Sequence, residues 1–177
     1  MALASLHRGW RPARRWSAAE LPAPWRRLLA DRSSLTARLR RQAGGRLAVD
    51  LIRQAVVPPH PLEARFLGLP PRRAALVREV FLGVPGQRWV YARSVIPLAV
   101  LVGHRRALRR LGERPLGTVL FADPDLERGE PEIARLPATA VPGLAGQAGW
   151  LWGRRSRFRA GASNLLVVEV FLPDYRP

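Results

Sequence analysis

Residues 75–97 read ALVREVFLGVPGQRWVYARSVIP, two mostly apolar strings joined by a short connection. Branched and aromatic side chains are frequent in both strings, which is typical of β-strands. The connection through Pro85, Gly86 and Gln87 is far too short for a crossover helix. The two strings are therefore expected to pair as an antiparallel hairpin, and this hairpin predicts a fold built on an antiparallel sheet.

The segments that precede the hairpin supply two helices and a strand. A short helix is predicted from Pro24 to Leu29, and a second follows Ser33 or Ser34 as N-cap and stops at Gly44. Residues 46–57 alternate like a strand. Residues 57–73 contain five prolines and are expected to be loop.

The segments that follow the hairpin continue the mixed pattern. Helices are predicted over residues 98–111 and 115–121, the second with a proline in its first turn. Residues 137–149 are rich in Ala, Gly and Pro and read as a flexible excursion. Further strands are expected at 132–136, 151–159 and 165–172. This order of elements indicates the α+β class, with an antiparallel sheet.

Length and composition indicate one globular domain. Of the 177 residues 47% are hydrophobic, and no apolar run reaches the roughly 20 residues that span a bilayer. We expect an irregular basic arm over residues 1–20, one domain over 21–177, no stable membrane insertion and a cytoplasmic location.

The residue types that are missing exclude several chemistries. The chain has no cysteine and no lysine, so thiol catalysis and lysine Schiff bases are excluded. Only His7, His60 and His104 could offer imidazole, and their separation in sequence argues against a metal site. There is also no glycine-rich nucleotide motif. Arginine, carboxylates, hydroxyls and backbone are left for function.

Two strands place a charge among apolar side chains, since alternate residues of a strand share a face. Arg78 shares its face with Leu76, Val80 and Leu82, and Glu169 shares its face with Leu165, Val167 and Phe171. A buried charge needs a partner or a ligand. The pattern alone favours a structural Arg–Glu pair across the sheet, or a solvated face, over a ligand site.

The same analysis of alternate residues applies to the stretch WLWGRRSRFR at 150–159. Arg155, Arg157 and Arg159 lie on one face with Leu151, whereas Arg154 lies with Trp152, Ser156 and Phe158. A platform for single-stranded nucleic acid would place aromatics and arginines on one exposed face. The pattern instead predicts a half-buried strand with a solvated basic side.

Five segments resemble, in chain order, the motifs of the chorismate–pyruvate lyase family: LVREVFL, W-x-x-ARSVIP, LGERPLGTVLF, LWGRRSRF and LLVVEVFLP. The resemblance runs from Leu28 to Pro173. It implies a single six-stranded antiparallel sheet with helices packed around it and a ligand site under helical flaps. It also implies elimination of pyruvate from chorismate to give 4-hydroxybenzoate, an early step of ubiquinone biosynthesis, with no metal and no organic cofactor. We further expect a monomer.

The resemblance assigns four site residues. Arg78 would bind a carboxylate of the substrate, and Glu169 would orient the ring hydroxyl or act as a base. Leu35 and Leu116 would line the pocket. Leu35 stands where many members have methionine, a volume-conserving difference. In the favoured hypothesis the leaving enolpyruvyl group collects the ring hydrogen in a cyclic transition state while arginines hold a reactive conformer.

Two other functions compete with the lyase. A non-catalytic ligand-sensing domain of the same fold would ordinarily follow a DNA-binding domain, and only about twenty unassigned residues precede Leu21. A nucleic-acid-binding protein would explain the net charge of +17. However, the arginines are scattered along the chain, which indicates general arginine enrichment and not a basic binding face.

Overall fold

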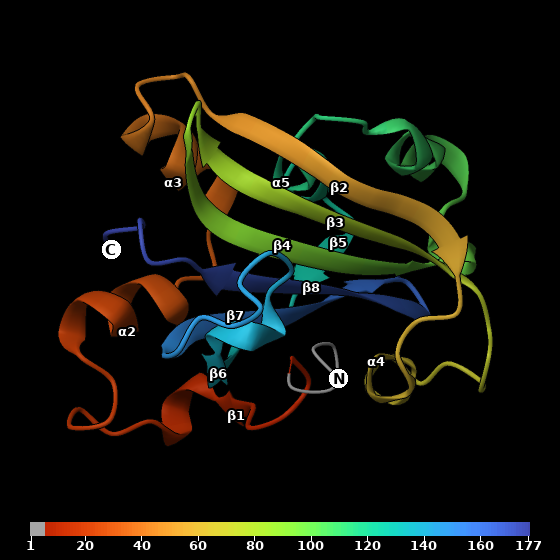
Figure 1. The fold of residues 1–177 in the computed structure, drawn as a ribbon. Coiled ribbons are helices and arrows are strands. Elements are labelled where there is room, and N and C mark those ends of the chain that lie inside the picture. The colour runs from red at the N-terminus through yellow and green to blue at the C-terminus, as the bar shows by residue number, and fades with distance from the viewer. Residues whose placement is uncertain (1–5) are drawn as a thin grey trace.

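The hairpin predicted at residues 75–97 is formed in the computed structural model, which describes residues 6–177. Its strands are β3 (Ala75–Val84) and β4 (Gln87–Pro97), and they lie inside a larger antiparallel sheet (Figure 1). The strand order is β1-β6-β7-β8-β4-β3-β2, and β5 pairs with β7. The remaining strands are β1 (Arg11–Pro12), β2 (Ala48–Val57), β5 (Leu126–Arg128), β6 (Glu132–Pro137), β7 (Trp150–Ala160) and β8 (Ser163–Phe171).

The sheet has eight strands, so the expectation of six was wrong. The two additional strands, β1 and β5, are the two shortest. β6 pairs only with residues 150–155 of β7, whereas β5 pairs with residues 158–160. β5 therefore satisfies backbone groups of the long strand β7 that β6 does not reach, and β1 does the same at the outer edge of β6. Strands of two or three residues carry no recognisable alternation.

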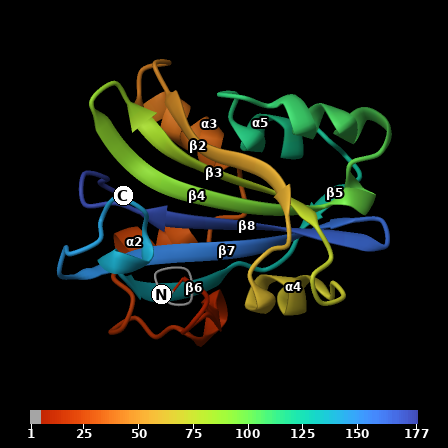
Figure 2. The same ribbon diagram turned by 45° about the vertical axis from the view of Figure 1, so that its right-hand side comes forward.

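Both faces of the sheet are covered, and this explains why β3 and β8 are buried almost throughout. One face packs against α2 (Ala23–Leu29), α3 (Leu35–Gln42), η3 (Gly103–Arg110) and α5 (Leu116–Leu120). The other face packs against α4 (Pro61–Leu67), η4 (Ala138–Ala140) and the first described residues. Figure 2 shows α3 and α5 on one side of the sheet and α4 on the other.

The two helices predicted before β2 are both formed. α2 begins with Pro24 in its first turn, and α3 has Ser34 as N-cap, whose side chain accepts a hydrogen bond from the backbone N–H of Ala37. Leu35 and Leu39 of α3 are buried against the sheet. This packing places the N-terminus of α3 over the centre of the sheet.

The prediction of loop for residues 57–73 was wrong, because α4 lies within them. His60 caps α4 and Glu63 completes a capping box, while Pro61 occupies the first turn, where a proline costs no hydrogen bond. Gly68, with φ +68°, ends the helix in the left-handed region. The high proline content therefore concealed a well-capped helix.

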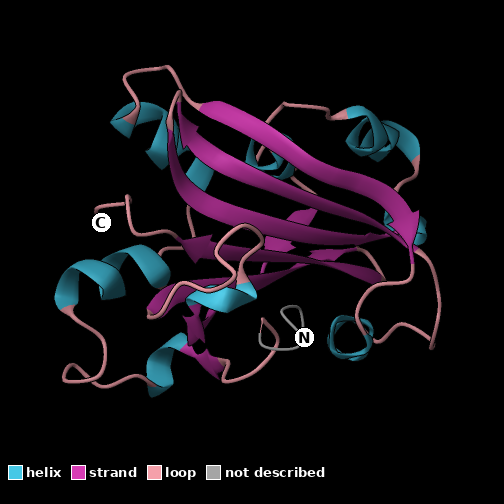
Figure 3. Ribbon diagram, viewed as in Figure 1, coloured by secondary structure: helices cyan, strands magenta, loops and turns pink. Residues whose placement is uncertain are grey.

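The prediction of a single helix over residues 98–111 was also wrong. The segment forms two 3-10 helices, η2 (Leu98–Val100) and η3, which are separated by Leu101 and the extended Val102, and η3 begins at Gly103 with φ +53°. A helix cannot continue through these two conformations. Figure 3 shows the helices and loops that surround the sheet. No helix within residues 6–177 has the length and apolarity needed to cross a membrane.

Two segments predicted to be irregular contribute to the core. Ala138, Ala140 and Val141 are almost completely buried, so the excursion at 137–149 begins inside the protein. Within the predicted arm, β1 and η1 (Ala13–Arg15) are regular, and Leu6 is fully buried. Small side chains fit close to the sheet without a regular pattern. Residues 1–5 of that arm lie outside the described residues.

Candidate active site

A small cavity lies between one face of the sheet and the helices α3 and α5. Its wall includes all four residues that the sequence predicted for the site: Leu35, Arg78, Leu116 and Glu169. They come from α3, β3, α5 and β8 respectively. Tertiary folding therefore brings together positions as much as 134 residues apart in sequence.

Arg78 contributes a buried positive charge to this cavity. It is 2% exposed, and its Nη2 donates hydrogen bonds to the backbone oxygens of Gly112 (2.8 Å) and Arg114 (3.0 Å). No carboxylate among residues 6–177 forms an ion pair with it, and its Nε has no partner there. Burial lowers the pKa of Arg78 to about 10, so the guanidinium is still charged at neutral pH. Such a group is suited to bind an anionic ligand.

Glu169 is held by two arginines. Nε of Arg154 lies 2.5 Å from its Oε2, and Nη2 of Arg128 lies 3.5 Å from the same oxygen. Arg154 is itself fixed, because its Nη1 donates to the backbone oxygens of Leu28 (2.9 Å) and Asp31 (2.8 Å). Glu169 therefore forms an Arg–Glu pair across the sheet, as the pattern favoured, but its partner is Arg154 on the neighbouring strand, and Arg78 has no such pair among residues 6–177. Neither Arg78 nor Glu169 lies on a solvated face.

Arg128 also lines the cavity, and the sequence reasoning missed it. It is 8% exposed, its Nε donates to Oγ of Ser156 (3.0 Å), and its Nη1 donates to the backbone oxygen of Ser33 (2.9 Å). Burial lowers the pKa of Arg128 to about 10, and the charge of Arg154 acts in the same direction. The short strand β5 that carries Arg128 left no signal in the sequence pattern.

Two helix starts close the cavity. Leu35 and Leu116 are the first residues of α3 and α5, and both are buried. Gly117 lies so close to α3 that a Cβ at this position would be 2.3 Å from Oγ1 of Thr36. The cavity volume is about 40 Å³, whereas ligand pockets usually measure roughly 300–1,000 Å³. A ligand would therefore require α3 and α5 to move apart.

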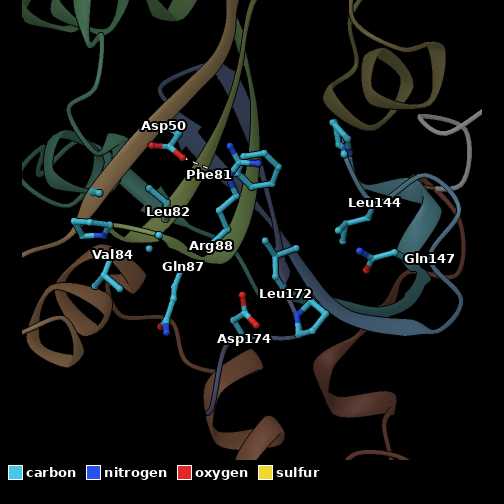
Figure 4. A pocket seen from close by; sticks show the side chains of 17 residues that line it. Asp50, Phe81, Leu82, Val84, Gln87, Arg88, Leu144, Gln147, Leu172 and Asp174 are labelled. Carbon is cyan, nitrogen blue, oxygen red and sulfur yellow. Dashed lines mark hydrogen bonds and ion pairs between the residues drawn. The ribbon is translucent and has the colours of Figure 1, made fainter.

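A larger groove of about 570 Å³ lies at the turn of the β3–β4 hairpin (Figure 4). Its walls come from that turn, the C-terminal residues and the 142–147 segment. Asp50 and Arg88, which lie in it, pair with each other at 3.4 Å, and each side chain is 58% exposed. No buried charge is available to a ligand in this groove. The smaller cavity is therefore the better candidate.

A second buried polar cluster lies on the opposite face of the sheet. Arg93 donates to Glu63 through Nε (2.7 Å) and Nη2 (2.8 Å) and to Glu79 through Nη1 (2.9 Å), while the hydroxyl of Tyr91 donates to Glu79 (2.6 Å). The guanidinium of Arg93 is paired with both carboxylates, and none of the three side chains lines either cavity described above. The cluster connects α4 to the sheet, so its role is structural. No group of three His, Asp or Glu residues suited to a metal ion occurs within residues 6–177.

Arg154 belongs to the stretch 150–159, and the parity argument for that stretch is confirmed for Arg154, Arg157 and Arg159 but not for Arg155, whose side chain is only 14% exposed. Arg154 is 1% exposed and faces the cavity side of the sheet. Arg157 and Arg159 on the other parity are exposed, and Arg155 stacks on Phe66 with its guanidinium 4.2 Å from the ring centre. The aromatic and cationic groups are therefore not arranged as an exposed stacking platform.

Comparison with known proteins adds independent findings. A family model described as chorismate lyase matches residues 9–176. A probable chorismate pyruvate-lyase of Chromohalobacter salexigens is 48% identical over 150 residues, covering 84% of this chain and 79% of that relative. Another, of Halorhodospira halophila, is 41% identical over 182 residues, with 95% of each chain covered.

Among solved structures, the ligand-binding domain of a putative GntR-family transcriptional regulator from Bordetella bronchiseptica has a similar fold. Its TM-score is 0.55 at 15% identity, and the match covers 75% of this chain and 94% of that one. This last likeness concerns the fold alone.

Proposed function

Because this chain belongs to the chorismate lyase family, we propose that it eliminates pyruvate from chorismate and releases 4-hydroxybenzoate, the ring precursor of ubiquinone. The observation that carries the proposal is the buried guanidinium of Arg78, which faces a closed cavity without a carboxylate partner among residues 6–177. An anionic substrate would supply that partner.

Arg78 and Glu169 are placed so that one ring can contact both. In the register of the sheet, Arg78 of β3 lies opposite Ser94 of β4, and Ser94 lies opposite Val167 of β8. Val167 precedes Glu169 by two residues. Two strand spacings and a two-residue step put the Cα atoms of Arg78 and Glu169 roughly 12 Å apart. Arg78 binds the ring carboxylate, and Glu169 accepts a hydrogen bond from the ring hydroxyl on the opposite side of the ring.

The reaction needs little from the protein beyond orientation and electrostatic stabilisation. The bond between the ring and the ether oxygen breaks, the ring loses the hydrogen beside the hydroxyl and becomes aromatic, and the enolpyruvyl group gains that hydrogen and leaves as pyruvate. Closed helices exclude water and hold the side chain near this hydrogen. Because Glu169 is fixed by Arg154 and Arg128, we assign it to orientation of the hydroxyl.

The first experiment mixes the purified protein with chorismate, without added metal or cofactor, and follows both products. We expect equal amounts of 4-hydroxybenzoate and pyruvate. Arg78→Met and Glu169→Gln should each lower kcat/KM roughly 100-fold or more, because each removes a buried charged contact. Arg106→Met and Glu127→Gln are matched controls, since both side chains are exposed, and they should stay near wild type.

Two results would contradict the proposal in different ways. Binding of chorismate without turnover would indicate a ligand sensor, as the fold of the bacterial regulator domain allows. Full activity of the Arg78 and Glu169 variants would leave the reaction standing and remove the site from this cavity.

A further inference from the structure

The buried charges around the cavity do not balance. Two guanidinium groups, those of Arg78 and Arg128, line the cavity with a single carboxylate, that of Glu169, which is also contacted by Arg154. The nearby Asp31 accepts hydrogen bonds from the backbone and hydroxyl of Ser33 and does not line the cavity. Because the only lining carboxylate, Glu169, is paired closely with Arg154, neither Arg78 nor Arg128 has a carboxylate of its own at short distance among the described residues. Uncompensated buried charge is costly, so the site is built for a ligand with two negative charges.

The positive charges of Arg78 and Arg128 lie at separate places. Arg154 is 1% exposed, contacts Glu169 at 2.5 Å and does not line the cavity, so it and Glu169 compensate each other. The charges left for a ligand are thus those of Arg78 on β3 and Arg128 on β5. These strands are separated in the sheet by β4, β8 and β7. A matching ligand has its two anionic groups at different positions.

Arg128 has hydrogen-bonding capacity left for one of these groups. A guanidinium carries five N–H bonds. Three of them are used, by Oγ of Ser156, the backbone oxygen of Ser33 and the distant Oε2 of Glu169. One N–H on each terminal nitrogen is left, so Arg128 can still donate two hydrogen bonds to a carboxylate.

We infer that Arg128 binds the enolpyruvyl carboxylate of chorismate, while Arg78 binds the ring carboxylate. The inference rests on the proposed function. In chorismate the ether-bearing carbon is the neighbour of the hydroxyl-bearing carbon, and the ring carboxylate lies across the ring. If Glu169 holds the hydroxyl, the enolpyruvyl group lies at the Glu169 end of the cavity, beside Arg128.

This position gives Arg128 a part in the reaction as well as in binding. When the bond between ring and ether oxygen breaks, its electron pair goes to that oxygen, which becomes the ketone oxygen of pyruvate. The ring hydrogen goes to the terminal carbon of the enolpyruvyl group, so nothing is added or left over. Arg128 is next to the group that receives electron density. After cleavage each arginine retains one monocarboxylate product.

The test compares a ligand with two carboxylates and a ligand with one. We would measure kcat/KM for chorismate and the inhibition constant of 4-hydroxybenzoate in Arg128→Met, Arg128→Lys and Arg78→Met, with Arg106→Met as the control for net charge. Arg128→Met should lower kcat/KM for chorismate roughly 100-fold. It should change the inhibition constant of 4-hydroxybenzoate less than about 3-fold, since this product lacks the second carboxylate. Arg78→Met should lower kcat/KM for chorismate and also weaken the binding of 4-hydroxybenzoate, because both molecules carry the ring carboxylate.

The remaining outcomes also decide the inference. Arg128→Lys should recover part of the loss, because it keeps the charge without the guanidinium donors, and it replaces the Met variant if that protein does not fold. If Arg128→Met impaired kcat/KM for chorismate and the binding of 4-hydroxybenzoate by equal factors, Arg128 would only position Glu169. That result would overturn the inference. If the wild type does not cleave chorismate, the proposed function fails. Equilibrium titration of the same variants with both ligands then judges Arg128 separately.

Discussion

At the scale of single residues, the sheet carries buried charges on both faces, and their surroundings separate structure from function. On one face the charge of Arg93 is compensated, because its guanidinium pairs with two glutamates. On the other face Arg78 is hydrogen-bonded only to backbone oxygens. A compensated charge stabilises the fold, whereas an uncompensated charge in a cavity is available to a ligand.

Arg93→Met tests the structural cluster. The substitution leaves Glu63 and Glu79 buried without their cation, so we expect a loss of about 3–5 kcal/mol in the free energy of unfolding, measured with urea. Activity of the folded protein should change little, because the cluster and the cavity lie on opposite faces.

Tyr91→Phe is a milder test of the same cluster. It removes only one hydrogen bond to Glu79 and should lower the free energy of unfolding by about 1–3 kcal/mol. An Arg93 variant of wild-type stability but without activity would contradict the assignment.

His7 predicts a dependence of stability on pH. Burial lowers the pKa of His7 from 6.5 to about 4, although the carboxylate of Glu63, 3.7 Å from Nε2, opposes the shift. Between these two pH values the unfolded chain binds a proton that the folded chain does not. Above pH 6.5 His7 therefore does not lower the free energy of unfolding. As the pH falls from 6.5 towards 4, protonation of His7 in the unfolded chain decreases that free energy.

His7→Phe isolates this contribution. The variant keeps a ring to stack on His60, whose ring centre is 4.5 Å away in the wild type, but it cannot take up a proton. We expect the wild type to lose up to about 3 kcal/mol more than the variant between pH 6.5 and pH 4. Urea unfolding at several pH values measures the difference. Parallel pH profiles for the two proteins would show that His7 does not titrate as its burial indicates.

At the scale of elements, the contact between α3 and α5 decides whether the cavity is closed. Gly117 permits this contact, because any side chain there would collide with Thr36. Gly117 has an ordinary backbone conformation, so its absence of a side chain is needed for space and not for φ. The PLG motif thus has a physical explanation in the closure of the site.

Gly117→Ala should push α5 away from α3. The collision of the new Cβ with Oγ1 of Thr36 is expected to cost about 1–3 kcal/mol of stability and to lower kcat/KM, since water would enter the site. Adding Thr36→Ala removes Oγ1 and should restore part of both losses, which a double-mutant cycle would measure. Additive effects of the two substitutions would mean that the contact does not control closure.

At the scale of the whole molecule, the net charge of +17 acts on association. Chorismate carries two negative charges, so the field of the protein should speed its arrival. We expect kcat/KM to fall roughly 3–10-fold as salt rises from about 0.02 to 0.2 M, while kcat at saturation stays constant. Replacing the exposed Arg106, Arg109 and Arg110 of η3 with glutamine should reduce the salt dependence. A kcat/KM that does not respond to salt would exclude such steering.

The sequence by itself determined the fold class, the β3–β4 hairpin, the capped helix α3 and four wall residues of the cavity. Each of these depends on local information. Strands show alternation, helices show caps, and the motif positions of Leu35, Arg78, Leu116 and Glu169 can be read one segment at a time. The matching family model covers nearly the whole chain, so the assignment of family needs no coordinates.

Only the tertiary structure decided which charges are compensated. Parity placed Arg78 and Glu169 on apolar faces, but ion pairs depend on strands that are distant in sequence. Glu169 meets Arg154 because β7 and β8 are neighbours, and it meets Arg128 because the three-residue strand β5 pairs with β7. A strand this short has no period of its own. Its place, and with it the proposed second carboxylate site, exists only in the folded sheet.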